Sequence, residues 1–314
     1  MLDLQLDAMM QQARAAGAPD LCDLPPVAAR DMYRHILAAA DRPPAGVSMR
    51  RQELPATSKR PALPVRVYTP VTSGPHGITV YFHGGGYVLG DLDGYDNVCR
   101  QLCEDSDSVV VTVEYRLAPE HPFPAAHDDA WDTLVWAREH ARDLGGDANR
   151  MAVAGDSAGA VLASACAIQA RDSGGPAIAF QALIYPPAAG GHGIYASHTA
   201  HAAGPTLTLR TVEYFGRHYW GDAGRSPDWR GAPLLAQDLS RLPAALVTLA
   251  AHDPIRDEGF AYAQALMKAG TPCTLVEYHG LAHGFISMAG ALPAARAAQL
   301  QIGLAIRSAL ADAR

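Results

Sequence analysis

The sequence has no long uninterrupted apolar run and no cluster of lysine or arginine. A helix that spans a bilayer needs about 18 or more consecutive apolar residues. No stretch of the 314 residues approaches that length, although 49% of them are apolar. Phosphate binding needs clustered cations, and this chain carries a net charge of −7. These absences argue against a membrane span, an anionic membrane surface and nucleic acid as partners.

Cysteine is scarce and lacks the spacing of a metal site. Five residues, an odd number, stand at positions 22, 99, 103, 166 and 273. We predict packed free thiols, which suit a reducing cytoplasm. The N-terminal stretch MLDLQLDAMMQQARAAG carries acids and no basic segment before an apolar core. It is not typical of a signal peptide, so we expect a cytoplasmic protein.

Short apolar β-rich runs alternate with helical stretches after the first forty residues, which are helical in pattern. The predicted strands are VSMRRQEL, PVRVYTP, ITVYFHGGG, SVVVTVEYRLAPE, RMAVAGDS, AIAFQALIYP, ALVTLAAHD and CTLVEYHG. The predicted helices between and after them include FPAAHDDAWDTLVWAREHARDLG and a C-terminal helix from about Pro293. This alternation predicts an α/β fold with a mainly parallel sheet covered on both faces. In such sheets, functional groups gather at the carboxyl ends of the strands.

The alternation is interrupted once. PAAGGHGIYASHTAHAAGPT is loop-like, and LTLRTVEYFGRHYWGD is an aromatic amphipathic helix. We therefore divide the chain into N-terminal cap helices (1–45), a first part of the core (46–186), a cap insertion (187–226) and a second part of the core (227–314). We expect the insertion and the N-terminal helices to form a lid over the carboxyl edge of the sheet.

A serine lies between two glycines in AVAGDSAGAV, residues 152–161. Its flanks predict a strand and an alanine-rich helix, so Ser157 occupies the strand-to-helix turn of a nucleophile elbow. Gly155 and Gly159 allow the tight turn and the close approach of helix and strand. The first amides of the helix lack intrahelical acceptors and stabilise negative charge.

A serine hydroxyl is a weak nucleophile unless a base takes its proton. Thirteen histidines compete for that role. His283, in HGLAHGFI, follows the last predicted strand, with Gly284 leaving room beside it. His279 is the alternative, but it lies at the strand terminus, where its direction is less free. We predict His283 as the base. Because the ring must be neutral, activity should fall below a pH of about 6–7.

The base needs an acid to hold its tautomer. ALVTLAAHDPIRDEGF ends a strand at Asp253. Asp257 and Glu258 fall at the start of the following helix, where acids favour the helix dipole. We predict Asp253 as the acid. The chain order serine, aspartate, histidine is one that is expected for a nucleophile elbow on a fold of this kind.

Three glycines follow another predicted strand, in YFHGGGYVLG. Glycines expose backbone amides without side-chain obstruction. We predict that the amides of Gly84 and Gly85, with that of Ala158, bind the oxygen of a tetrahedral intermediate. The alternative interpretation is a flexible turn.

The motifs HGGGYVLGDLDGYDNVCR, EYRLAPEHPFPAAHDD, GDSAGA, HDPIRDEG and HGF follow one another between about residues 78 and 286. With them the chain resembles the hormone-sensitive-lipase-like branch of the α/β-hydrolase family, which includes many bacterial carboxylesterases. The resemblance implies an eight-stranded, mostly parallel sheet flanked by helices, a helical cap and no metal or organic cofactor. It implies the same nucleophile, acid, base and oxyanion donors.

The resemblance also implies structural rather than catalytic roles for Tyr115, Arg116 and Glu120. Asp156, beside the serine, is expected to anchor its loop. After LIYP the chain departs from the usual continuation of the family, so the shape of this side of the pocket stays open.

The expected activity is hydrolysis of short- to medium-chain carboxylic esters through an acyl-enzyme. The same groups would also act on amides, lactones or carbamates. A non-catalytic ligand receptor is a further alternative, because fold does not fix function; such proteins often lack a member of the triad. A metal enzyme is another. The clustered His192, His198 and His201 lie in a Gly/Ala loop without a carboxylate or cysteine, and we interpret them as exposed loop histidines.

The partner we expect is a small ester. Tyr87, Tyr185 and Tyr195 are candidates for lining the substrate pocket, although aromatic residues near a core more often serve packing. The edge of the final predicted strand, CTLVEYH, is a candidate for pairing across a homodimer.

Overall fold

The computed structural model describes residues 1–40, 46–58 and 60–313. The predicted break between the N-terminal helices and the core falls partly on residues 41–45, outside the described residues. Within the described ranges, eight strands form one sheet in the order β1-β2-β4-β3-β5-β6-β7-β8. Strands β3 to β8 run parallel, whereas β2 is antiparallel to both β1 and β4. The predicted fold is confirmed.

The strands are β1 (Val47–Leu54), β2 (Leu63–Pro70), β3 (His76–Phe82), β4 (Ser108–Val113), β5 (Gly146–Asp156), β6 (Ile178–Ile184), β7 (Ala244–His252) and β8 (Cys273–Ala282). The α-helices are α1 (Leu4–Ala15), α2 (Pro26–Ala40), α3 (Asp96–Ser106), α4 (Ala125–Glu139), α5 (Ala158–Ser173), α6 (Ala196–Ala200), α7 (Leu209–Trp220), α8 (Arg256–Lys268) and α9 (Pro293–Asp312). Single 3₁₀ turns are η1 (Leu21–Asp23), η2 (Gly221–Ala223), η3 (Pro233–Leu235) and η4 (Phe285–Ser287).

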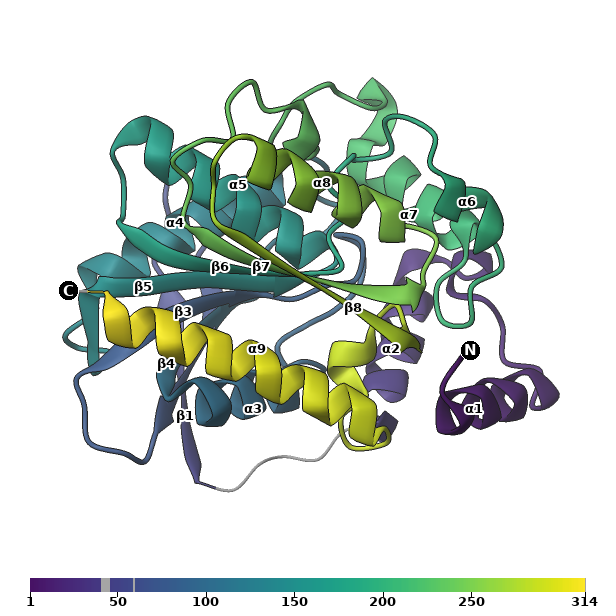
Figure 1. Cartoon of the computed structure of the whole chain (residues 1–314), viewed down its shortest axis with the longest axis horizontal. Coiled ribbons are helices and arrows are strands. Elements are labelled where there is room, and N and C mark those ends of the chain that lie inside the picture. Colours follow the sequence, from purple (N-terminus) through teal and green to yellow (C-terminus); the bar gives the residue numbers. More distant parts are fainter. Residues whose placement is uncertain (41–45, 59, 314) are drawn as a thin grey trace.

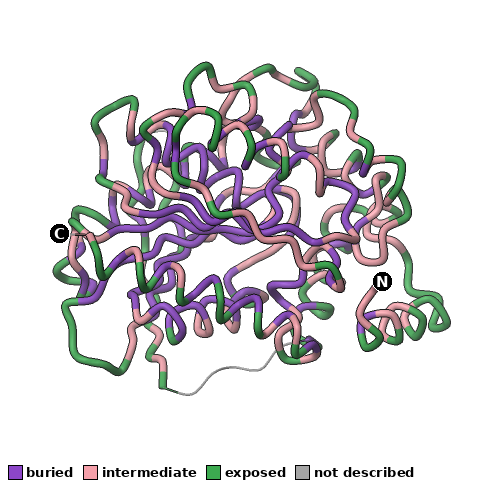
Figure 2. Tube along the Cα trace, viewed as in Figure 1, coloured by how far each residue is buried: buried purple, intermediate pink, exposed green. Residues whose placement is uncertain are grey.

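Helices cover both faces of the sheet. Figure 1 shows α3 and α9 against one face, and α4, α5 and α8 against the other. The central strands are buried along the middle of the molecule (Figure 2). Strand β4 illustrates why: every residue of SVVVTV is buried, and β-branched side chains suit a strand that packs on both faces. Its valines alternate between two cores, Val109 and Val111 on the α4–α5 side and Val110 on the α3–α9 side.

Two predicted boundaries are wrong in detail. The helix predicted to run through HARDLG ends at Glu139, and the chain then turns through Gly145, which has a φ of +81°. Strand β8 continues to Ala282, so His279 lies inside the strand, with an exposed side chain, rather than at its terminus. The C-terminal helix begins at Pro293 as predicted, because proline suits the first helical turn.

The predicted insertion carries α6 and α7. Both helices lie beyond the carboxyl ends of the central strands (Figure 1), where α7 packs against η1 and α6 against α8. The N-terminal segment and α7 are joined: Asp20 accepts a hydrogen bond from the Thr211 hydroxyl at 2.9 Å, and Asp23 pairs with Arg210 at 2.6 Å. The division of the chain into cap and core remains a prediction. In the described part of the chain, no helix combines the length and hydropathy needed to cross a membrane.

Candidate active site

Ser157 lies on the tight turn between β5 and α5. Its backbone is strained, with φ +53° and ψ −121°, a conformation that non-glycine residues rarely adopt. The close approach demands small neighbours. A Cβ on Gly155 would lie 2.3 Å from the carbonyl oxygen of Gly159, and one on Gly159 would lie 1.9 Å from that of Phe82. Both glycines are therefore required by backbone contacts, and the turn raises the serine side chain above the sheet.

The three side chains predicted as nucleophile, base and acid meet at the carboxyl edge of the sheet. Nε2 of His283 lies 2.9 Å from Oγ of Ser157, and Nδ1 of the same ring lies 2.7 Å from Oδ2 of Asp253. Asp253 is fully buried, and its other oxygen accepts the backbone amide of Ile255 at 2.9 Å. This arrangement fixes the carboxylate at Nδ1 of the ring and leaves Nε2 directed at the serine.

The alternative acids have other partners. Asp257 accepts the amide of Ser197 at 2.9 Å, and Glu258 accepts the amide of Ala189 at 3.0 Å. Glu258 also lies 3.1 Å from Nε2 of His198. Neither carboxylate is directed at His283.

Asp156 joins the serine turn to the glycine loop. One of its oxygens accepts the amide of Gly84 at 2.8 Å and the hydroxyl of Tyr81 at 2.7 Å. The other accepts the hydroxyls of Tyr95 at 3.1 Å and Tyr185 at 3.4 Å. Burial raises the pKa of Asp156 above its ordinary value, against these hydrogen bonds, which lower it. The expected anchoring role of Asp156 is confirmed.

The Asp156 contact corrects one predicted oxyanion donor. The Gly84 N–H already has a buried acceptor, so it is not free to bind a developing negative charge. Across the described residues, the amides of Gly85, Gly86 and Ala158 donate no hydrogen bond. The sequence did present the third glycine, but nothing in the motif alone separates an anchored amide from a free one.

Gly85 and Gly86, whose amides are free, are closely packed against neighbouring residues. A Cβ on Gly85, which has φ +110°, would lie 2.3 Å from the carbonyl oxygen of Leu89. One on Gly86, with φ +62°, would lie 2.2 Å from Cγ of Phe215 in α7. Glycine is therefore needed at both positions.

The residues expected to be structural hold the glycine loop and the segment that follows β4. Tyr115 donates its hydroxyl to the carbonyl oxygen of His83 at 2.8 Å and stacks on that ring. Arg116 pairs with buried Asp129 at 2.8 Å. Glu120 pairs with Arg30 of α2 at 2.6 Å, and this guanidinium lowers the pKa of Glu120 to about 2.

Arg30 also reaches the loop itself. It donates to the backbone carbonyls of Val88 at 2.8 Å and Ala118 at 2.9 Å. The role of Arg30 was not predicted, because a single arginine in an N-terminal helix gives no signal of its distant partners.

The three candidate pocket tyrosines lie in different surroundings. Tyr185 is 1% exposed, and its ring packs against His283 with centroids 4.5 Å apart, so it supports the base and offers almost no surface to a substrate. Tyr87 is buried and stacks on Tyr219 of α7 at 3.9 Å. Tyr195 is partly exposed and contacts His198. A pocket role for these residues stays a prediction.

The three histidines of the insertion each contact a different partner and do not face one another. Nε2 of His192 lies 3.1 Å from the carbonyl oxygen of Ser226, His198 pairs with Glu258, and His201 packs against His252. No group of three or more histidine, cysteine, aspartate or glutamate side chains within residues 1–40, 46–58 and 60–313 is arranged to hold a metal ion.

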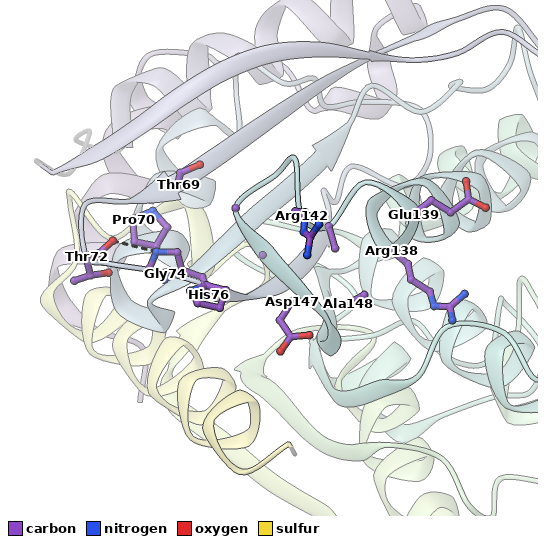
Figure 3. Close-up of a pocket in the computed structure, with 14 residues that line it drawn as sticks. Thr69, Pro70, Thr72, Gly74, His76, Arg138, Glu139, Arg142, Asp147 and Ala148 are labelled. Atoms are coloured by element: carbon purple, nitrogen blue, oxygen red, sulfur yellow. Dashed lines mark hydrogen bonds between the residues drawn. The ribbon is translucent and has the colours of Figure 1, made fainter.

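A broad groove of about 720 Å³ lies elsewhere, among residues at the amino ends of β3 and β5 and the end of α4. Figure 3 shows His76, Arg138, Arg142 and Asp147 around it. Ser157, Asp253 and His283 are not among the residues that line it. The reactive groups are at the opposite edge of the sheet, where the parallel strands end.

A family model described as the α/β-hydrolase fold matches residues 79–287. The chain belongs to this family. It is 42% identical over 256 residues to Esterase LipI of Mycobacterium tuberculosis, with 80% of each chain covered. It is 40% identical over 298 residues to Carboxylic ester hydrolase LipN of the same organism, covering 91% of this chain and 77% of that one. The resemblance to the hormone-sensitive-lipase-like branch is confirmed.

Solved structures of esterases superpose on nearly the whole of this chain. A thermostable esterase from Pseudomonas putida superposes with a TM-score of 0.93 at 31% identity, covering 98% of both chains. An esterase from Pyrobaculum calidifontis superposes with a TM-score of 0.89 at 36% identity, covering 98% of this chain and 99% of that one. This family member therefore shares its architecture with enzymes named as esterases.

Proposed function

We propose that this α/β-hydrolase is a serine carboxylesterase that hydrolyses short- to medium-chain esters through an acyl-enzyme. The carrying observation is the continuous contact from Asp253 through His283 to Ser157, at 2.7 and 2.9 Å. It is supported by the names of the relatives, which are esterases and carboxylic ester hydrolases.

In the proposed acylation step, Oγ of Ser157 attacks the ester carbonyl carbon as Nε2 of His283 takes the hydroxyl proton. Asp253 holds the Nδ1–H tautomer and stabilises the imidazolium. The tetrahedral intermediate collapses when its C–O bond to the leaving alcohol breaks and His283 returns the proton to that oxygen. Water then repeats the sequence on the acyl-enzyme, releasing the carboxylic acid and free Ser157.

The oxyanion formed in both steps needs donors that are not already engaged. We assign this role to the amides of Gly85, Gly86 and Ala158, because the Gly84 amide is bonded to Asp156. Removing one such donor typically costs about 10²–10³ in turnover. The loop is fixed before substrate arrives, so little reorganisation is needed during the reaction.

Turnover of p-nitrophenyl butyrate by the Ser157→Ala variant tests the proposal. We expect kcat to fall by roughly 10⁴–10⁶-fold. Ser173→Ala, at the exposed end of the same helix, is the matched control and should retain wild-type kinetics. Turnover by Ser157→Ala at the wild-type rate would contradict the proposal. A cytoplasmic location, expected from the free cysteines, stays a prediction.

A further inference from the structure

The insertion that carries α6 is hydrogen-bonded to the loops that hold both the acid and the base. On the base side, the Thr206 hydroxyl donates to the backbone carbonyl of His283 at 2.7 Å. Elsewhere in the described chain, no second donor to that carbonyl is found. Among the described residues, Thr206 is therefore the one donor found for the backbone carbonyl of the predicted base.

On the acid side, the contacts come from Ser197 at the start of α6. Its hydroxyl donates to the carbonyl of Pro254 at 2.7 Å, and its amide donates to Asp257 at 2.9 Å. Pro254 directly follows Asp253. Ser197 is fully buried, so its hydroxyl contact with Pro254 is shielded from water and holds the acid loop firmly.

Between these two contact points the insertion passes close to the acid loop. A Cβ on Gly204 would lie 3.3 Å from Cδ of Pro254 and 2.5 Å from the carbonyl oxygen of Leu207. The segment 204–206 thus passes against the acid loop before Thr206 reaches the base.

The base needs this support because its backbone belongs to no helix or strand. His283 lies between the end of β8 at Ala282 and η4, and the next residue, Gly284, has a left-handed φ of +82°. A backbone shift there moves the ring away from Oγ of Ser157. Misplacement of a catalytic group by about 1 Å costs on the order of 10²-fold in rate.

We propose that Thr206 is a positioning residue for His283, and that the insertion clamps the acid and base loops in the geometry that hydrolysis needs. The inference rests on the proposed function, since it concerns the same three side chains. It adds that the insertion determines turnover through the placement of the base, independently of any contact between the insertion and substrate.

The test compares Thr206→Val, which keeps the shape but removes the hydroxyl, with Thr206→Ser, which keeps the hydroxyl. Thr199→Val, at an exposed position of α6, is the matched control. Steady-state kinetics with p-nitrophenyl butyrate give kcat and KM separately. The Nδ1 proton of His283, followed by NMR of the free enzyme, reports ring placement without any substrate. Thermal unfolding of each variant checks that the fold is kept.

We expect Thr206→Val to lower kcat by roughly ten-fold with KM within about two-fold, and to broaden the Nδ1 proton signal through faster exchange with water. Thr206→Ser should restore most of the wild-type kcat and signal. A rise in KM with unchanged kcat, equal losses in Thr206→Val and Thr206→Ser, or kinetics of Thr206→Val equal to those of Thr199→Val would overturn the proposal. Failure of the proposed function shows up separately, as turnover that survives in Ser157→Ala.

Discussion

The carboxylate of Asp156 accepts the amide of Gly84 at 2.8 Å, which ties the serine turn to the glycine loop. We expect Asp156→Ala to leave the Gly84 amide and the Tyr81 hydroxyl without acceptors. Each buried unsatisfied group costs about 1–3 kcal/mol, so urea denaturation should show a clear loss of stability, and kcat should fall as the loop loosens. Asp156→Asn keeps an acceptor oxygen and should lose much less of both. Equal stability of the two variants would contradict this account of Asp156.

Gly86 is packed against the ring of Phe215 in α7. Gly86→Ala should lower kcat by roughly 10²-fold, because the new methyl group forces the loop and its free amide out of place. Adding Phe215→Ala removes the ring and should recover part of the loss. Gly224 has a similar φ of +70° with open space around it, so Gly224→Ala controls for backbone strain alone. The account of this contact fails if Gly86→Ala and Gly224→Ala have the same kcat.

Stability should fall as pH drops below the ordinary range of histidine. Burial lowers the pKa of His127 to about 3 and that of His83 to about 4. The unfolded chain binds these protons near the ordinary pKa of about 6.5, whereas the folded chain does not. Unfolding therefore takes up protons between about pH 6.5 and pH 3–4, and the free energy of unfolding decreases with falling pH in that window.

His127→Gln tests this assignment. The glutamine side chain does not titrate and has an amide that can pair with the Tyr219 hydroxyl, which lies 2.7 Å from Nε2 of His127. Urea midpoints measured at several pH values between 7 and 4 should decline less steeply for His127→Gln than for the wild type. Parallel declines would show that His127 does not contribute to acid sensitivity.

The rate of ester hydrolysis should depend on the length of the acyl chain, because aromatic rings lie beside the glycine loop. Phe215 packs on Gly86, and the stacked rings of Tyr87 and Tyr219 occupy the neighbouring space. We expect kcat/KM for p-nitrophenyl esters to be highest with short and medium acyl chains and to be low with palmitate. An optimum at palmitate would contradict the assignment to an esterase of short- to medium-chain substrates.

Much of the fold could be predicted from the sequence because its helices and strands follow simple patterns. Strands buried on both faces are nearly continuous apolar runs, as in β4, and α9 starts at a proline that suits the first helical turn. Ser157, Asp253 and His283 each follow a strand of one parallel sheet. Their convergence at one edge was therefore predictable from strand polarity alone.

The features that could not be predicted depend on contacts between residues that are far apart in the sequence. Gly84 and Gly85 look equivalent in HGGG, and only the arrival of Asp156 from β5 shows which amide is occupied. Thr206 lies in a segment of low sequence specificity, so its contact with the His283 carbonyl was not foreseeable. Helix α4 ends before its helical pattern does, because the chain must turn at Gly145 to enter β5.

Covalent labelling tests the central claim most directly. The native protein is treated with a fluorophosphonate probe, and the modified peptide is identified by mass spectrometry. We predict a single adduct on Oγ of Ser157, prevented when His283 is replaced by glutamine and lost in Ser157→Ala. An adduct on another residue with undiminished ester hydrolysis by Ser157→Ala would contradict the account.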